Sequence, residues 1–185
     1  MMPCSNKHVA FLRGINVGGR GVLKMQDLAR MFTSAGCENV KTYIQSGNVV
    51  FEARAGDLHR PHRTIEKQLR DRLGVEVKVV LRTSREIENL MRLDPFKKAG
   101  RDPKAKRYVA FLHGTPRSKP ALPLISAKEG IEVFLVKNLE AFSLSREVKG
   151  RYGFPNAFIE KELGVTATTR NWNTVGRIAA LASSR

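Results

Sequence analysis

The chain has 185 residues, long enough for one domain or two small ones, and 42% of them are hydrophobic, as in an ordinary globular protein. No apolar run approaches the roughly 18 residues that a membrane span requires, and the first residues lack the apolar segment of a signal peptide. The two cysteines, Cys4 and Cys37, fit no CxxC or metal-ligand spacing. We therefore expect a cytoplasmic, reduced protein that holds no metal and no cofactor.

Charge is the most informative bulk property, because 33 lysines and arginines oppose 17 carboxylates and give a formal net charge of +16. Such an excess attracts polyanions, nucleic acid above all. A soluble surface rich in arginine and lysine gives the same number without any such partner, since net charge reports on association and not on fold. Both interpretations stay open from the sequence.

The first half of the chain predicts alternating strands and helices. An apolar run that ends at Gly14 is typical of a buried strand, and apolar residues at helical spacing up to Gly36 indicate a helix. Thr83 and Glu86 form a capping box that opens a later helix. The expected elements are a strand over residues 8–13, a helix over 25–35, strands over 40–44 and 48–51, a helix over 58–73, a strand over 75–82 and a helix over 84–93.

The second half repeats parts of the first. The sequence VAFLRG at residues 9–14 returns as VAFLHG at 109–114, and IEK at 65–67, ahead of LGV, returns at 159–161, again ahead of LGV. Two matches in the same order argue for an internal duplication. The second half is expected to hold strands over 107–113, 131–136, 139–144 and 165–169 and helices over 156–163 and 174–182. Pro116, Pro120 and Pro123 would shorten or break any helix in the segment after the first of these strands.

We therefore predict an α+β fold made of two ferredoxin-like β-α-β-β-α-β halves, each followed by a helix. The halves span residues 1–95 and 107–185, and they could pack as one compact domain. Residues 96–106 form a basic linker between them, which we expect to be too polar to pack and to be mobile.

The segment between the first strand and the first helix has four glycines in eight residues, as GINVGGRG at residues 14–21. Glycine permits positive φ and close approach of the backbone to a ligand, and a strand–loop–helix order suits anion binding. Candidate ligand-binding residues here are Arg13, Gly14, Asn16, Gly18 and Gly19. The segment matches neither GxGxxG nor GxxxxGK[ST], so a long connection with structural glycines is the alternative.

A turn between two predicted strands should emerge at the same end of the sheet as this glycine segment. Gln45, Ser46, Gly47 and Asn48 would then form a polar cup beside Asn16. Amides and hydroxyls fix the orientation of a ligand and supply little acid–base power. This cup indicates recognition more than catalysis.

A second segment with several candidate ligand-binding residues comes where the last strand leads into the last helix. Arg170 could contact an anion, and Trp172, the only tryptophan, could stack on a base. Asn171 and Asn173 complete this candidate ligand-binding group. The structural alternative makes one of the asparagines a helix cap and Trp172 a core anchor.

The sequence shows few residue patterns typical of catalytic or metal sites, and we assign no catalytic and no metal-binding residue. No Ser-His-Asp order stands out among the four histidines, and Cys37 has no evident base, which favours an idle thiol. His59 and His62, each followed by arginine, are interpreted as part of the basic surface.

Several motifs together resemble one bacterial family, the domain of unknown function 1697. They are RGINVGG at residues 13–19, YIQSGNVVF at 43–51, DPF at 94–96 and TTRNWNTV at 168–175, and the resemblance runs from about Lys7 to Leu181. It implies a duplicated α+β fold in a cytoplasmic bacterial protein, with no activity to carry over. Many members carry a Gly-Arg-Ser-Lys-Leu-like segment where this chain has GRYGF at 150–154, so a mechanism that needed that lysine would be lost here.

The function we expect is non-enzymatic binding of nucleic acid or another polyanion through the basic surface, with no membrane partner. Phe11 and Phe111 lie in the first strands of the two halves, but their apolar neighbours indicate core, and no RNP motif is present. The alternative is an enzyme or sensor for a small phosphorylated or carboxylated ligand at the glycine segment.

Overall fold

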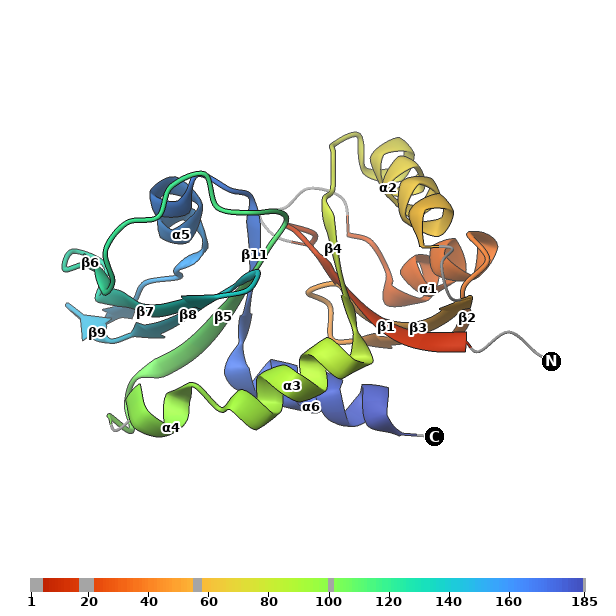
Figure 1. Cartoon of the computed structure of the whole chain (residues 1–185). Coiled ribbons are helices and arrows are strands. Elements are labelled where there is room, and N and C mark those ends of the chain that lie inside the picture. Colours follow the sequence, from red (N-terminus) through yellow and green to blue (C-terminus); the bar gives the residue numbers. More distant parts are fainter. Residues whose placement is uncertain (1–4, 17–21, 55–57, 100–101, 185) are drawn as a thin grey trace. The chain divides into compact units, whose positions relative to one another are not determined.

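The computed structural model describes residues 5–16, 22–54, 58–99 and 102–184 (Figure 1). The chain divides into two compact units, which we call unit 1 (Met1–Asn89 with Arg177–Arg185) and unit 2 (Leu90–Gly176). The divisions fall inside helices α3 (Ser84–Leu93) and α6 (Trp172–Ser183), so each unit contains part of both. This division differs from the predicted one, which kept residues 1–95 together and placed the last helix wholly in the second half.

Unit 1 is built on a four-stranded antiparallel sheet in which the first strand lies between the third and the fourth. Its order is β2-β3-β1-β4, made of β1 (Ser5–Leu12), β2 (Glu38–Tyr43), β3 (Asn48–Arg54) and β4 (Val79–Thr83). The four strands and the two helices between them come in the order β-α-β-β-α-β along the chain, as the sequence predicts for this half.

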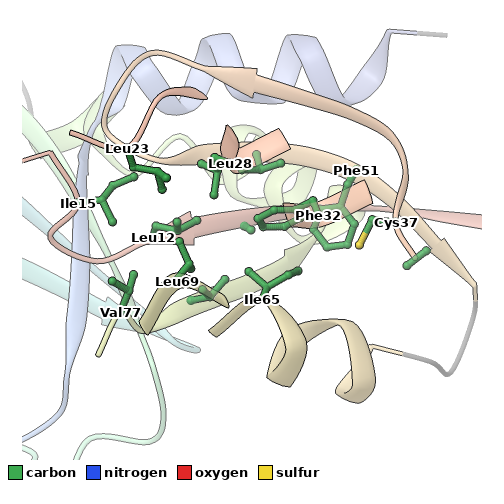
Figure 2. Close-up of a cluster of buried hydrophobic side chains, with 14 residues drawn as sticks. Leu12, Ile15, Leu23, Leu28, Phe32, Cys37, Phe51, Ile65, Leu69 and Val77 are labelled. Atoms are coloured by element: carbon green, nitrogen blue, oxygen red, sulfur yellow. The ribbon is translucent and has the colours of Figure 1, made fainter. Parts of the chain in front are cut away.

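Two amphipathic helices, α1 (Met25–Ser34) and α2 (His59–Leu73), cover one face of this sheet (Figure 1). Figure 2 shows their apolar side chains in a single cluster with those of the strands, including Phe32 beside Phe51. The rings of these two phenylalanines lie edge to face with centroids 5.2 Å apart. Burial of such side chains contributes roughly 1.5–3 kcal/mol each, so this cluster is the main source of stability in unit 1.

The other face of the sheet is covered by the parts of α3 and α6 that belong to unit 1. Ile87 and Ile178 are buried there. Ser183 Oγ donates a hydrogen bond to Glu88 Oε1 at 3.4 Å, and Lys7 Nζ on β1 donates to the carbonyl oxygen of Ser184. Helices therefore lie on both faces of this sheet, although the edge strand β2 keeps exposed residues.

Unit 2 contains a five-stranded antiparallel sheet of order β11-β5-β8-β7-β6. Its strands are β5 (Lys106–Leu112), β6 (Leu124–Ser126), β7 (Ile131–Lys137), β8 (Glu140–Ser145) and β11 (Ala167–Asn171). Helix α5 (Asn156–Leu163) packs on one face, and a short hairpin of β9 (Glu147–Val148) and β10 (Arg151–Tyr152) follows β8. The mixed α+β fold with antiparallel sheets agrees with the predicted class.

The second unit departs from the predicted β-α-β-β-α-β order between its first two long strands. The residues between β5 and β7 form no helix and contain the short strand β6, which pairs with the edge strand β7. Pro116, Pro120 and Pro123 explain the difference, because proline lacks the N–H that a helix interior needs. The prediction of a helix at this place in the second half was wrong.

The two units share details at their repeated motifs. Glu66 Oε1 on α2 accepts a hydrogen bond from the N–H of Val79 at 3.0 Å, and Glu160 Oε1 on α5 accepts one from the N–H of Ala167 at 2.8 Å. Each carboxylate thereby holds the start of the strand that follows its helix. Both helices also end at a glycine in the left-handed region, with φ of 68° and 61°.

The segment predicted to be an unpacked basic linker is anchored in unit 2. Phe96 begins the short helix α4 (Phe96–Ala99) and is 2% exposed. Its ring centroid lies 5.1 Å from that of Trp172 and 5.5 Å from that of Phe134. Ala105, near the other end of the segment, is also buried. Two apolar residues thus outweigh the polar composition of the segment, and the prediction that it would not pack was wrong.

Candidate nucleic-acid interface

Asn16 holds the start of the glycine segment to the turn between β2 and β3. Its Oδ1 accepts a hydrogen bond from the N–H of Leu23 at 2.8 Å, and its Nδ2 donates to the carbonyl oxygen of Gln45 at 2.9 Å. Asn16 adopts a φ of 56°, a left-handed conformation that asparagine tolerates better than most residues. The Asn16 amide therefore links Leu23 to the turn between β2 and β3.

The turn itself packs against Ile15 of the glycine segment. Gly47 has a φ of 74°, and a Cβ there would lie 2.5 Å from Ile15 Cδ1, so only glycine fits. Asn48 is buried, and its Nδ2 donates to the carbonyl oxygen of Tyr43 and to Ser46 Oγ, both at 3.0 Å. The side-chain amide of Asn48 is thus used in building the turn.

The structure brings part of the predicted polar cup together. Asn16 meets Gln45, and Asn48 meets Ser46, within unit 1. Arg13 and Gly14 are exposed at the end of β1. Gly18 and Gly19 lie outside the described residues.

The other predicted group lies in unit 2, and its two largest side chains are buried. Arg170 Nη1 donates to Thr168 Oγ1 at 2.8 Å and to the carbonyl oxygen of Thr169 at 3.0 Å. Burial lowers the pKa of the Arg170 guanidinium to about 10. The side chain is therefore held within the unit, where a large surface ligand does not reach it.

Trp172 is 8% exposed and packs against Phe96 and Phe142, as the core-anchor alternative predicted. Asn171 Oδ1 accepts a hydrogen bond from the N–H of Asn173 at 2.9 Å in the first turn of α6. Asn171 thus acts as a cap, and Asn173 is exposed.

Helix α2 is positively charged, with five arginines and lysines against two carboxylates. We call Arg60, Arg63, Lys67 and Arg70 the α2 stripe. At 3.6 residues per turn these four side chains share one side of the helix, directly opposite the buried residues Pro61, Ile65 and Leu69. All four are exposed. Sequence reasoning noted the charge around residues 59–63 but missed the stripe, although its spacing of three, four and three residues was readable.

The α2 stripe borders a surface hollow of about 180 Å³ that ends at the approach to β4. It is lined by Arg63, Glu66, Lys67, Arg70, Glu76, Val77 and Lys78. Glu66 is engaged with the backbone of Val79, as described above. Cations thus outnumber the remaining carboxylates at this surface.

The four cations of the stripe differ in whether they pair with a carboxylate among the described residues. Lys67 Nζ lies 2.9 Å from Asp71 Oδ2, and Arg70 Nε lies 4.0 Å from Asp71 Oδ1. The hydrogen bond from Lys67 keeps the pKa of the Asp71 carboxyl below its ordinary value. Arg60 and Arg63 form no ion pair with any residue that the structure describes. No described carboxylate therefore neutralises these two guanidinium groups.

The phenylalanines of the first strands cannot serve as the base-stacking rings that ferredoxin-like RNA binders use. Phe11 and Phe111 are both fully buried. Cys37 is buried as well, and burial raises the pKa of its thiol to about 11, so the thiolate is a minor form at neutral pH. Among the described side chains no group of three or more His, Cys, Asp or Glu residues is arranged to hold a metal ion.

The fold and this surface define an α+β protein with antiparallel sheets and a charged, exposed helix. The chain belongs to the family described as "Protein of unknown function (DUF1697)", whose model matches residues 5–142. The resemblance of the sequence motifs to that family is thereby confirmed. No curated protein matches the chain.

A solved structure has a similar fold. It is that of the conserved bacterial protein SP0830 from Streptococcus pneumoniae, which is 19% identical in sequence with a TM-score of 0.66. The match covers 98% of this chain and 100% of that one. At this identity the similarity shows the fold alone. No helix in the described part of the chain is long and apolar enough to cross a membrane.

Proposed function

We propose that this protein binds nucleic acid or another polyanion without catalysing a reaction on it, and that the α2 stripe is its main contact. The observation that carries the proposal is the placement of Arg60 and Arg63, which are exposed, unpaired among the described residues and opposite the buried side of α2. A net charge of +16 supports it by raising the potential that attracts a polyanion.

Binding through the α2 stripe would be directed at phosphates. Arginine presents a planar set of donors that matches phosphate oxygens, and such contacts fix position without reading sequence. The phenylalanines of β1 and β3 in unit 1 are buried, so they offer no base contacts that would add specificity. We therefore expect affinity that depends steeply on salt and little on sequence.

We also propose that each unit is a ferredoxin-like module and that the two derive from one duplicated ancestor. The matched glutamate contacts of Glu66 and Glu160 support this. So do Arg82 and Arg170, which occupy corresponding register positions opposite Val9 and Val109 and each donate to the carbonyl oxygen of the preceding residue. In unit 2 the first helix of the module would have been replaced by the proline-rich segment and β6.

A small anionic ligand at the glycine segment has less support as the function. The amides of Asn16 and Asn48 are engaged within the protein, so fewer groups remain to orient such a ligand. A cytoplasmic location, where nucleic acid is available, is part of the proposal.

The test is a charge-neutralising double variant, Arg60→Gln with Arg63→Gln. The loss of two phosphate contacts should weaken binding of a 20-base-pair DNA duplex about thirtyfold near 150 mM salt and should reduce the log–log salt slope by about 2. Fluorescence anisotropy with labelled duplex across a salt series measures both.

The matched control removes the same charge elsewhere, as Arg72→Gln with Lys119→Gln. Arg72 is on α2 but outside the stripe, and Lys119 is an exposed residue of unit 2. This control should weaken binding less than threefold. Equal losses in the two variants would show that only net charge matters and would refute the stripe as the contact.

A further inference from the structure

Unit 2 carries three aromatic rings beside several lysines and arginines: one on β5, one on β10 and one on the segment that links β10 to α5. We call Tyr108, Tyr152 and Phe154 the aromatic cluster. The rings of Tyr108 and Phe154 meet edge to face, with centroids 5.6 Å apart at 90°. Phe154 is 57% exposed, an unusual state for a ring of this size.

A cation adjoins the same cluster. Lys106 Nζ lies 4.0 Å from the centroid of the Tyr152 ring, and Tyr152 Oη donates to the carbonyl oxygen of Lys104 at 3.2 Å. Lys106 and Tyr108 are two residues apart on β5, so their side chains leave the same face of the sheet about 7 Å apart. Tyr152 and Phe154 therefore contact neighbouring positions of one strand face, through Lys106 and Tyr108.

The backbone that presents Phe154 is held firmly. Ser145 Oγ on β8 donates to the carbonyl oxygen of Gly153 at 2.8 Å. A Cβ at position 153 would lie 2.4 Å from the carbonyl oxygen of Glu129, so the chain passes this point as closely as glycine permits. Pro155, buried, then leads into α5. An exposed ring on a fixed backbone loses little conformational entropy when a ligand stacks on it.

The charge around the cluster complements a polyanion. Lys104, Lys106, Lys149 and Arg151 are all exposed in this region. Two carboxylates lie in the same region, because Glu147 is directly opposite Tyr152 in the hairpin register and Glu129 Cβ would lie 3.0 Å from a Cβ at position 153. The four cations thus outnumber them. Aromatic rings bordered by several cations are the chemistry by which proteins bind single-stranded nucleic acid, because bases stack on the rings while phosphates meet the cations.

We infer that the aromatic cluster binds single-stranded nucleic acid, with a base stacked on Phe154 and phosphates held by the surrounding cations. The inference rests on the proposed function and extends it, since it adds a preference for unpaired strands that the α2 stripe alone does not supply. A duplex keeps its bases stacked on one another and has none free for Phe154.

The test compares two probes of equal phosphate number, a labelled 12-residue oligothymidylate and a hairpin duplex, on the full chain. Phe154→Ala should weaken binding of the oligothymidylate roughly five- to fiftyfold, whereas duplex binding should change less than twofold. Phe154→Tyr keeps an aromatic face and should retain most of the affinity. Ile125→Ala serves as the matched control, because Ile125 is another exposed apolar residue of unit 2, at 65%.

The outcomes separate this inference from the function on which it rests. If the wild-type protein binds both probes and Phe154→Ala changes neither, or weakens both equally, the aromatic cluster is refuted and the α2 stripe is untouched. If the α2 variant has no effect while Phe154→Ala removes only single-strand binding, the α2 stripe is refuted and the aromatic cluster is supported. If the wild-type protein binds neither probe, both are refuted. A thermal melt of each variant shows that the fold is intact.

Discussion

Glu66 and Glu160 show how a repeated sequence motif becomes a repeated contact. Each lies on a helix, and its carboxylate accepts the backbone N–H at the start of the strand that follows. A buried N–H without a partner is costly, so a polar side chain at this position is required by the fold and need not point to chemistry. The repetition of IEK thus carries structural information and no catalytic information.

At the residue scale, we expect Glu160→Ala to lower the free energy of unfolding by about 1–3 kcal/mol, because the N–H of Ala167 loses its partner. Glu160→Gln should cost less, since its amide oxygen can still accept the bond. Urea denaturation measures the difference. Glu162→Ala is the control on the same helix, where the ion pair with Lys161 is exposed and worth little. A loss at Glu160 no larger than at Glu162 would contradict this role.

The candidate residues differ in how far sequence could predict them. The meeting of the glycine segment with the turn before Asn48 follows from strand order alone, and the structure places Asn16 against Gln45. The burial of Arg170 and Trp172 could not be predicted in this way. It depends on Phe96 and on register with β5, which are more than fifty residues away along the chain.

At the element scale, strands and helices in unit 1 follow their hydrophobic periods, and the predicted helices at residues 25–35 and 58–73 appear as α1 and α2. Local sequence composition does not predict packing where a single apolar residue anchors an otherwise polar segment. Phe96 is the only large apolar residue in the stretch predicted as a linker, and it anchors α4 against three aromatic rings. Averaged composition conceals such an anchor.

Because Phe96 fills the centre of this aromatic group, we expect Phe96→Ala to destabilise the protein by about 3–5 kcal/mol. Phe96→Leu should cost markedly less, since it keeps most of the buried volume. Chemical denaturation monitored by the fluorescence of Trp172, the only tryptophan, reports on the same group. A cost for Phe96→Ala below about 1 kcal/mol would mean that the segment is not anchored there.

At the scale of the whole molecule, the structure shows where some of the positive charge behind the net +16 is exposed. In the proposed function, the α2 stripe in unit 1 would supply guanidinium groups for phosphates, and the aromatic cluster in unit 2 would supply a surface for unpaired bases. Net charge could be read from the sequence, and the stripe from its spacing. The aromatic cluster could not, since Tyr108 and Phe154 are brought together only by the path of the chain after β10.

The most direct test of the central claim is the salt dependence of nucleic-acid binding by the wild-type protein, freed of co-purified nucleic acid. Fluorescence anisotropy with single-stranded RNA and duplex DNA should give a log–log slope of roughly −4 to −5, as six phosphate contacts would produce. Measurable affinity should persist near 150 mM salt. A flat salt dependence, or binding that vanishes at that salt, would contradict the account and reduce the positive charge to a property of the solvated surface.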